Sequence, residues 1–255
     1  MASSAPDPAT DPVGFYDDAY SRDADEAALY ARWRALGALG KADHVTTLCR
    51  RSGLRPVSTL EVGCGDGALL SELHRRGFGG VLAGVEISEA AVAIARSRAE
   101  IASVERYDGR RLAAADGAFE LGIVSHVLEH VPEPAALLAE VARACGAVVV
   151  EVPLEANWSA RRAGRRRHAA EVGHLQRLNR AAARSIVTAA GLTVAAELED
   201  PLPLRAQTFF ATSARARAAA SAKWALRSGA HALARPAARR AFTVHWAALC
   251  RRPGA

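Results

Sequence analysis

The sequence is poor in lysine and lacks long apolar runs. Lys41 and Lys223 are its only lysines, so 31 of its 33 basic residues are arginine. No stretch of ~18 uncharged apolar residues occurs, so neither a membrane-spanning helix nor stable membrane insertion is expected. The N-terminal residues MASSAPDPATDP lack the basic start and apolar core of a secretory signal. The four cysteines form no CxxC pair, which favours a reduced, cytoplasmic setting without a disulfide framework or zinc site.

Charge is distributed unevenly along a chain that carries +6 overall. Residues 153–255 hold 18 basic and 5 acidic residues, a net +13, which leaves −7 on residues 1–152. Arginine forks onto phosphate and carboxylate, so the second half suits an anionic ligand. An arginine bias set by coding composition alone remains the alternative.

Short apolar strands alternate with helical stretches over residues 57–152. This rhythm predicts a doubly wound α/β sheet. Two more strands, expected at 192–199 and 241–250, complete a Rossmann-like fold with seven strands. We expect residues 1–14 to be a flexible tail and residues 15–255 one domain, with a cofactor-binding half (57–152) and an acceptor-side half (153–255).

Helices are expected on both sides of this region. The N-terminal pattern predicts two of them, at 23–40 and 41–53. Residues 154–178 are typical of a polar connection, after which Asn179 caps a helix that Gly191 ends. Residues 209–240 are predicted as a helical insertion before the last strand, either a lid over the acceptor or a homodimer contact. A basic helix carrying Phe, Trp and Leu can also lie on an anionic membrane.

The stretch LEVGCGDG, residues 60–67, ends the first predicted strand. Gly63, Gly65 and Gly67 permit a tight turn and a close approach of ligand to backbone, and the next helix offers free N–H groups. The spacing alone also satisfies the dinucleotide pattern G-x-G-x-x-G/A. Acids then follow successive strands: Glu86 can accept hydrogen bonds from ribose hydroxyls, and Asp108 can meet an exocyclic amine.

Together, LEVGCGDG, GVEIS, YDG and SHVLEHVPEP resemble the class I S-adenosylmethionine-dependent methyltransferases of the small-molecule group. The likeness covers residues 57–152, and GHLQRLNRAAARSIVTAAGL extends it more weakly. The chain departs from the family where Phe119-Glu120 replaces the usual Phe-Asp. The resemblance implies S-adenosylmethionine as cofactor, S-adenosylhomocysteine as product, and these cofactor contacts: Glu61, Gly63, Cys64, Gly65, Asp66, Gly67, Glu86, Ile87, Ser88, Asp108, Gly109, Ser125 and His126.

Methyl transfer needs a base only if the acceptor must lose a proton. His126, nearest the expected methyl, and His174, on the segment expected to cover the acceptor, are the catalytic candidates; Glu129 and His130 are expected to be architectural, as their family counterparts often are. A metal bound by His126 and His130 is not expected, because the sequence places no third ligand at a fitting distance. Glu151 can hold an acceptor hydroxyl or close a helix end. Tyr16 and Tyr20, on a segment expected to close over the cofactor, are candidates to contact it.

The sequence says least about the methyl acceptor. The stretch ARRAGRRRH, residues 160–168, is either a solvated loop or a grip for phosphate or carboxylate. It has no interleaved aromatics for base stacking, so nucleic acid is not favoured. We expect a methyltransferase acting on a small molecule in specialised (natural-product) metabolism, with an anionic or sugar-nucleotide acceptor. The alternatives are a nucleic-acid-directed methyltransferase and a protein that binds the cofactor without methylating.

Overall fold

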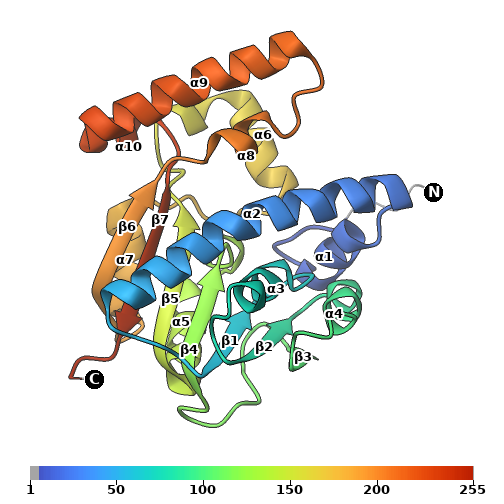
Figure 1. The fold of residues 1–255 in the computed structure, drawn as a ribbon, viewed down its shortest axis with the longest axis vertical. Helices are drawn as coiled ribbons and strands as arrows, with labels where there is room; N and C mark the ends of the chain where they lie inside the picture. Colours follow the sequence, from blue (N-terminus) through green and yellow to red (C-terminus); the bar gives the residue numbers. More distant parts are fainter. Residues whose placement is uncertain (1–5, 255) are drawn as a thin grey trace.

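The computed structural model describes residues 6–254, and over that range the strands form one seven-stranded sheet in the order β3-β2-β1-β4-β5-β7-β6. All neighbours are parallel except β7, which runs antiparallel to both β5 and β6 (Figure 1). The predicted fold class is therefore confirmed. The strands are β1 Ser58–Val62, β2 Val81–Glu86, β3 Ser103–Arg106, β4 Phe119–Ser125, β5 Cys145–Pro153, β6 Thr193–Asp200 and β7 His245–Arg251.

Helices cover both faces of the sheet. Because side chains alternate along a strand, Val149 of β5 joins the core under α2, α3 and α4, while Val148 and Val150 join the core under α5 and α7. The helices are α1 Pro12–Tyr20, α2 Ala24–Arg51, α3 Ala68–Arg75, α4 Glu89–Arg96, α5 Pro134–Ala144, α6 Ala163–Glu171, α7 Arg180–Ala189, α8 Leu204–Thr208, α9 Ala214–Leu233 and α10 Arg235–Ala241, with 3-10 turns η1 Leu128–His130 and η2 Ser159–Arg161.

The N-terminal region differs from the prediction in two ways. Helix α2 is continuous over 28 residues, where two helices were predicted. Glycine inside a helix is unfavourable by about 1 kcal/mol, but Gly37 and Gly40 lie beside a buried stripe that packs on the sheet and keeps the helix intact. Helix α1 begins at Pro12, inside the expected tail, because Asp11 caps it. Residues 1–5 of that tail lie outside the described residues.

The acceptor-side half contains more helix than predicted. The expected polar connection at 154–178 includes α6, and the insertion before β7 is built of α8, α9 and α10. Figure 1 shows α6, α8 and α9 stacked beyond the end of the sheet, with α8 close to α2. Phe209 and Phe210 pack against Trp33 there, with ring centroids 5.3 and 5.1 Å apart. Within residues 6–254, every helix is too short or too polar to cross a bilayer.

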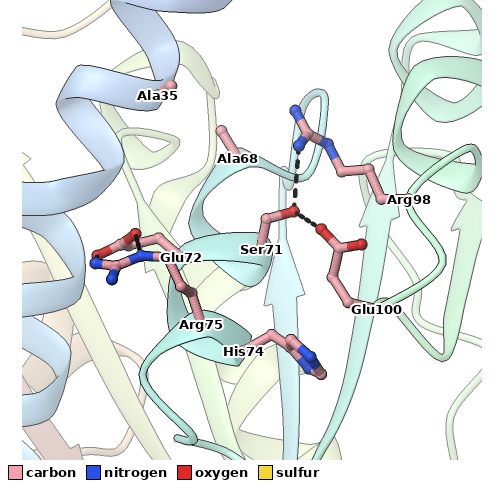
Figure 2. Close-up of a pocket in the computed structure, with 8 residues that line it drawn as sticks. All are labelled: Ala35, Ala68, Ser71, Glu72, His74, Arg75, Arg98 and Glu100. Carbon is pink, nitrogen blue, oxygen red and sulfur yellow. Dashed lines mark hydrogen bonds and ion pairs between the residues drawn. The ribbon is translucent and has the colours of Figure 1, made fainter.

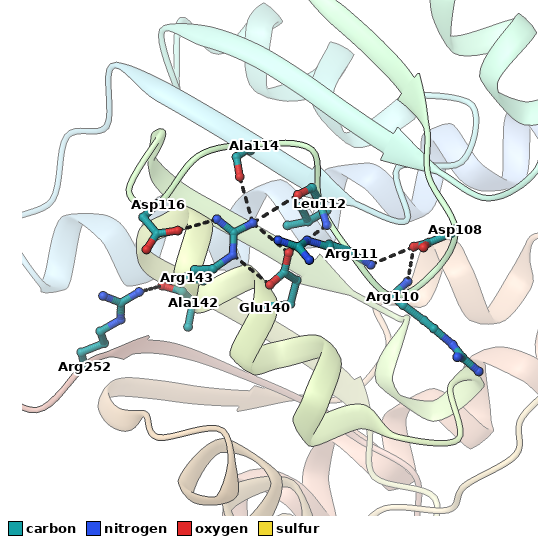
Figure 3. A network of polar contacts seen from close by, with 10 residues as sticks. All are labelled: Asp108, Arg110, Arg111, Leu112, Ala114, Asp116, Glu140, Ala142, Arg143 and Arg252. Atoms are coloured by element: carbon teal, nitrogen blue, oxygen red, sulfur yellow. Dashed lines mark hydrogen bonds and ion pairs between the residues drawn. The ribbon is translucent and has the colours of Figure 1, made fainter.

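The long connection between β3 and β4 is held by one arginine. The Arg143 guanidinium of α5 bonds the Glu140 carboxylate, Asp116, and the backbone carbonyls of Leu112 and Ala114 (Figure 3). A residue with five donors in a rigid fork can tie several loop acceptors at once. Arg143 thus holds the segment after Asp108 in place, although that segment forms no helix or strand.

Leu249→Ala should lower the free energy of unfolding by about 2–5 kcal/mol, because the truncation leaves a cavity where the buried side chain packs. Leu233→Ala is the matched control, since Leu233 on α9 is 90% exposed, and should change it by no more than about 0.5 kcal/mol. Urea denaturation measures both. Similar losses for the two variants would contradict the burial of Leu249 in the core.

Candidate active site

The three glycines after β1 form the cradle that the sequence predicted. Gly63, Gly65 and Gly67 all have positive φ, at 72°, 53° and 75°. A Cβ atom at Gly63 would lie 2.6 Å from Val127 Cγ2, and one at Gly65 would overlap the Tyr20 hydroxyl. The loop therefore needs glycine for both its backbone conformation and its close contacts. It leads into α3, whose first turn has no side-chain cap.

Glu86 ends β2 with its carboxylate turned toward the glycine loop. Oε1 accepts hydrogen bonds from the backbone N–H groups of Ile87 (2.7 Å) and Ser88 (3.1 Å), and Oε2 accepts one from Gly65 (2.9 Å). Burial raises the pKa of Glu86, against the lowering effect of these donors. A carboxylate oxygen can accept two hydrogen bonds, so Oε2 keeps one position for a hydroxyl donor.

Glu61 lies fully inside the fold just before the glycines. Its Oε2 is buried without a hydrogen-bond partner. Burial raises the pKa of Glu61 to about 8, while Lys41 acts in the opposite direction. A buried carboxyl that lacks a partner is a place where a cationic ligand group would be stabilised.

The side chains of three other predicted cofactor residues differ in what they contact. Asp66 is buried and pairs with Arg34 of α2 at 2.8 Å, and the Cys64 side chain lies against Gly84 in the core. Both side chains therefore serve the scaffold here. Asp108 is exposed and accepts hydrogen bonds from the backbone of Arg110 and Arg111, both 2.8 Å (Figure 3).

The segments after β2 and β3 meet beside the loop. A Cβ atom at Gly109 would lie 3.5 Å from the Ile87 side chain, which brings the Asp108 turn next to the end of β2. Ser88 caps α4 through Ala91 N–H and donates its hydroxyl to Asp17 of α1 at 2.6 Å. Ile87, Ser88 and Gly109 thus lie together, as expected for neighbouring parallel strand ends.

Helix α1 covers this edge of the sheet. The Tyr20 hydroxyl lies on Gly65, and the Tyr16 hydroxyl is 2.8 Å from His130 Nδ1. Burial raises the pKa of both phenols. The two tyrosines that the sequence suggested as cofactor contacts therefore both reach the site, one on the glycine loop and one on the turn after β4.

His126 begins that turn in a conformation that is rare for its residue type. Its φ is 58°, the positive value that a side chain with a Cβ seldom adopts. Its Nδ1 is 3.1 Å from Glu129 Oε1, and its side chain keeps 23% exposure. His126 outweighs the effect of burial on Glu129 and lowers the pKa of that carboxyl to about 2. Strain of this kind persists only where surrounding contacts enforce it.

The second catalytic candidate joins the same polar network. His174 Nδ1 is 2.7 Å from Glu155 Oε2, and its ring stands 4.8 Å from the His130 ring. His130 Nε2 in turn is 4.0 Å from Glu129 Oε1. His126 and His174 are thus connected through Glu129 and His130, although 48 residues separate them in the chain.

Sequence reasoning missed a second cluster on the other side of His126. The Glu151 carboxylate of β5 is surrounded by His126, His44 of α2 and His245 of β7. Burial alone would lower the pKa of His44, but Asp200 and Glu151 outweigh the effect of burial and raise this pKa to about 10. Ser125, a predicted cofactor residue, donates its hydroxyl to Glu151 Oε2 at 3.3 Å. The sequence signal was weak: single histidines on otherwise apolar elements.

A surface hollow beside α3 is separate from this network. Figure 2 shows Ser71 bonded to Glu100 and Arg98, and Glu72 bonded to Arg75. These groups satisfy one another, and the hollow meets the glycine loop only from behind, where Ala68 follows the loop and Arg98 pairs with Asp66 at 3.7 Å. The candidate site therefore lies at the carboxyl edge of the sheet and not in this hollow.

The residues present fit a nucleoside cofactor with an ammonium group. The glycine cradle admits a close ligand, Glu86 retains an acceptor position, and the unpartnered Oε2 of Glu61 suits a cation. The imidazoles of His126 and His174 and the buried carboxylates of Glu129 and Glu151 are groups that can accept or hold a proton.

Comparison with known proteins agrees with this geometry. A family profile described as "Methyltransferase domain" matches residues 30–197. A ubiquinone biosynthesis O-methyltransferase from Acinetobacter baumannii (strain ACICU) is 30% identical over 106 residues, 39% of this chain and 42% of that protein. The chain thus matches less than half the length of this curated relative.

Solved structures share the fold over most of the chain. One is a chain of the complex between the Haloferax volcanii Trm112 methyltransferase activator and a methyltransferase, with a TM-score of 0.62, 17% identity, and coverage of 93% of this chain and 97% of that one. Another is the [4+2]-cyclase SpnF, with a TM-score of 0.56, 21% identity, and coverage of 83% and 81%.

Binding of S-adenosylhomocysteine is expected to release a proton from Glu61. With a pKa of about 8, this carboxyl is largely protonated near neutral pH, and an ammonium group beside it would favour the ionised form. Affinity should therefore rise from about pH 6 to about pH 8, by up to about tenfold per unit. Calorimetry in buffers of different ionisation enthalpy counts the protons. Release that persists in Glu61→Gln, or no release by the wild type, would contradict the assignment.

Proposed function

The chain belongs to the class I S-adenosylmethionine-dependent methyltransferases, and we propose that it methylates a hydroxyl group of a small molecule. The observation that carries the proposal is a juxtaposition. The glycine cradle with Glu61 and Glu86 lies at the same sheet edge as His126 and Glu129, at the ends of the adjacent strands β1, β2 and β4. One edge thus offers both a cofactor seat and groups that handle a proton.

We assign the cofactor seat to the residues after β1, β2 and β3. Gly63, Gly65 and Gly67 would lie against the methionine part, with Glu61 beside its ammonium group. Glu86 would hold the ribose and Asp108 the adenine. When bound, S-adenosylmethionine supplies a methyl group that its cationic sulfur already activates, so the protein's task is to align the acceptor and exclude water.

His126 is the proposed general base. Glu129 orients its ring through Nδ1, which leaves Nε2 as the nitrogen that can accept a proton. His174 is the second candidate, but Glu155 already engages its Nδ1 at 2.7 Å. The curated relative from Acinetobacter baumannii is an O-methyltransferase, which supports an oxygen acceptor.

The acceptor is proposed to be small and anionic, in specialised metabolism, with sugar nucleotides among the candidates. Arg162, Arg165 and His168 line a shallow hollow at the start of α6. Burial and these two arginines lower the pKa of Arg227 on α9. Like charges held this close are typical of a surface that binds phosphate or carboxylate. On this proposal α6 and α9 would cover the bound acceptor, as expected for a lid.

Glu86→Gln should weaken S-adenosylhomocysteine binding about 10- to 100-fold, because a charge-assisted hydrogen bond contributes about 1.5–3 kcal/mol. Glu89→Gln, three residues on and exposed on α4, is the control and should bind like the wild type. Calorimetry with matched thermal melts separates lost affinity from lost folding. Equal affinity in all three proteins would refute the role of Glu86.

Transfer itself is tested with methyl-labelled S-adenosylmethionine and a panel of hydroxylated, phosphorylated and nucleotide-sugar acceptors. The wild type should pass label to at least one small molecule, and His126→Ala should lower the rate at least about 100-fold if it acts as base. Label recovered only in RNA or DNA would favour the nucleic-acid alternative. Tight cofactor binding without transfer to any acceptor would favour a protein that binds the cofactor for another purpose.

A further inference from the structure

Two imidazole nitrogens converge on one buried carboxylate oxygen at the end of β5. Glu151 Oε1 is 3.5 Å from His126 Nε2 and 3.4 Å from His245 Nδ1. The three ligand atoms of this group all lie within 4.8 Å of one another. They come from β5, the turn after β4, and β7, so only the folded sheet assembles them.

These contacts are too long for good hydrogen bonds. An N–H···O bond is ordinarily about 2.9 Å between heavy atoms. Glu151 Oε1 and His126 Nε2 are both buried without a hydrogen-bond partner, and the Glu151 side chain is 1% exposed. Buried polar atoms left unpaired are rare in native proteins and need a physical explanation.

The spacing matches ligands arranged around a metal ion. Two ligands about 2.05 Å from one ion at the tetrahedral angle are about 3.3 Å apart. We propose that His126 Nε2, His245 Nδ1 and Glu151 Oε1 bind a divalent transition-metal ion. Two imidazoles and one carboxylate are a donor set that suits Zn²⁺, Fe²⁺, Mn²⁺ or Co²⁺ and leaves coordination positions open.

The surrounding residues orient the proposed ligands. Glu129 Oε1 lies 3.1 Å from His126 Nδ1, so a proton on Nδ1 leaves the Nε2 lone pair for the ion. Ser125 holds the other oxygen of Glu151 at 3.3 Å. His44 stands between Glu151 and Asp200, at 3.3 and 3.0 Å, and we assign it as a positioning residue that fixes Glu151 from α2.

The site is closed at its base and open toward the acceptor side. Glu151 is 1% exposed, whereas the side chains of His126 and His245 keep 23% and 16% exposure. A metal-bound Nε2 cannot also accept a proton, so His126 would act either as the base or as a ligand. With the ion bound, an acceptor hydroxyl could enter an open coordination position and be made more acidic there, and the second candidate, His174, would take its proton. The metal site rests on the ligand geometry alone, and only its link to the acceptor rests on the proposed function.

The competing explanation is charge balance without a metal. In that case a protonated His44, between Glu151 and Asp200, compensates the buried carboxylate, and the two other imidazoles only pack against it. The two explanations differ in stoichiometry: charge balance requires no bound ion at any concentration that leaves surface histidines empty.

The test is metal binding by the full chain after chelation and dialysis. Titration with Co²⁺, followed by its visible absorption, and elemental analysis after Zn²⁺ loading should each give one ion per chain. His245→Gln and Glu151→Gln should each weaken binding at least about 10- to 100-fold. His74→Ala is the matched control, because that histidine is exposed on α3, away from the proposed ligands, and its loss should leave affinity unchanged.

Thermal melts keep the result interpretable if a variant is less stable. Zn²⁺ should raise the melting temperature of the wild type and of His74→Ala, and should not raise that of His245→Gln. Absence of a bound ion in the wild type, or equal affinity in His245→Gln, would overturn the proposal. S-adenosylhomocysteine binding by the metal-free protein is measured in parallel, so a failed metal site and a failed cofactor site give different results.

Discussion

The structure depends on how four buried glutamates at one edge of the sheet are neutralised. Glu61, Glu86, Glu129 and Glu151 are each less than 9% exposed, and all lie at or just beyond the carboxyl ends of parallel strands. A buried charge without a partner is strongly destabilising. Each acid therefore requires a hydrogen-bond donor, a bound proton or a cation. The kind of partner that each acid has determines the chemistry of this edge of the sheet.

The four carboxylates meet this requirement differently. Backbone N–H groups engage Glu86, and His126 lies beside Glu129. Glu61 has only distant Lys41 and tends toward its protonated form, with a pKa of about 8. Three imidazoles surround Glu151, which ties α2, β4 and β7 to the site. Glu61 Oε2 and Glu151 Oε1 are buried without a hydrogen-bond partner, and these are the two acids to which we assign a bound cation. Glu129 also lacks a hydrogen-bond partner, but the His126 and His130 imidazoles stand beside it. Helices α1 and α2 complete the edge by bringing Tyr20, Tyr16 and His44 onto it.

The part of the site that could be predicted is the part encoded locally. A strand, three glycines and a helix are consecutive, and the next two strand ends place Glu86 and the Asp108 turn beside them by the geometry of parallel sheets. The cluster around Glu151 could not be predicted, because His44 lies 107 residues before Glu151 and His245 lies 94 residues after it. Continuous α2 was missed because sheet packing outweighed two glycines, and α6 was missed because its polar surface carries no apolar periodicity. The direction of individual side chains could not be predicted from the sequence either. Cys64 and Asp66 belong to the predicted loop, yet both side chains turn into the scaffold.

The most direct test of the central claim is a crystal structure of the chain grown with S-adenosylhomocysteine. The ligand should lie against Gly65, with its ribose hydroxyls on Glu86 and its ammonium group beside Glu61 Oε2. A ligand found elsewhere, or one that leaves Glu61 and Glu86 without contact, would contradict the assignment of this sheet edge as the cofactor seat.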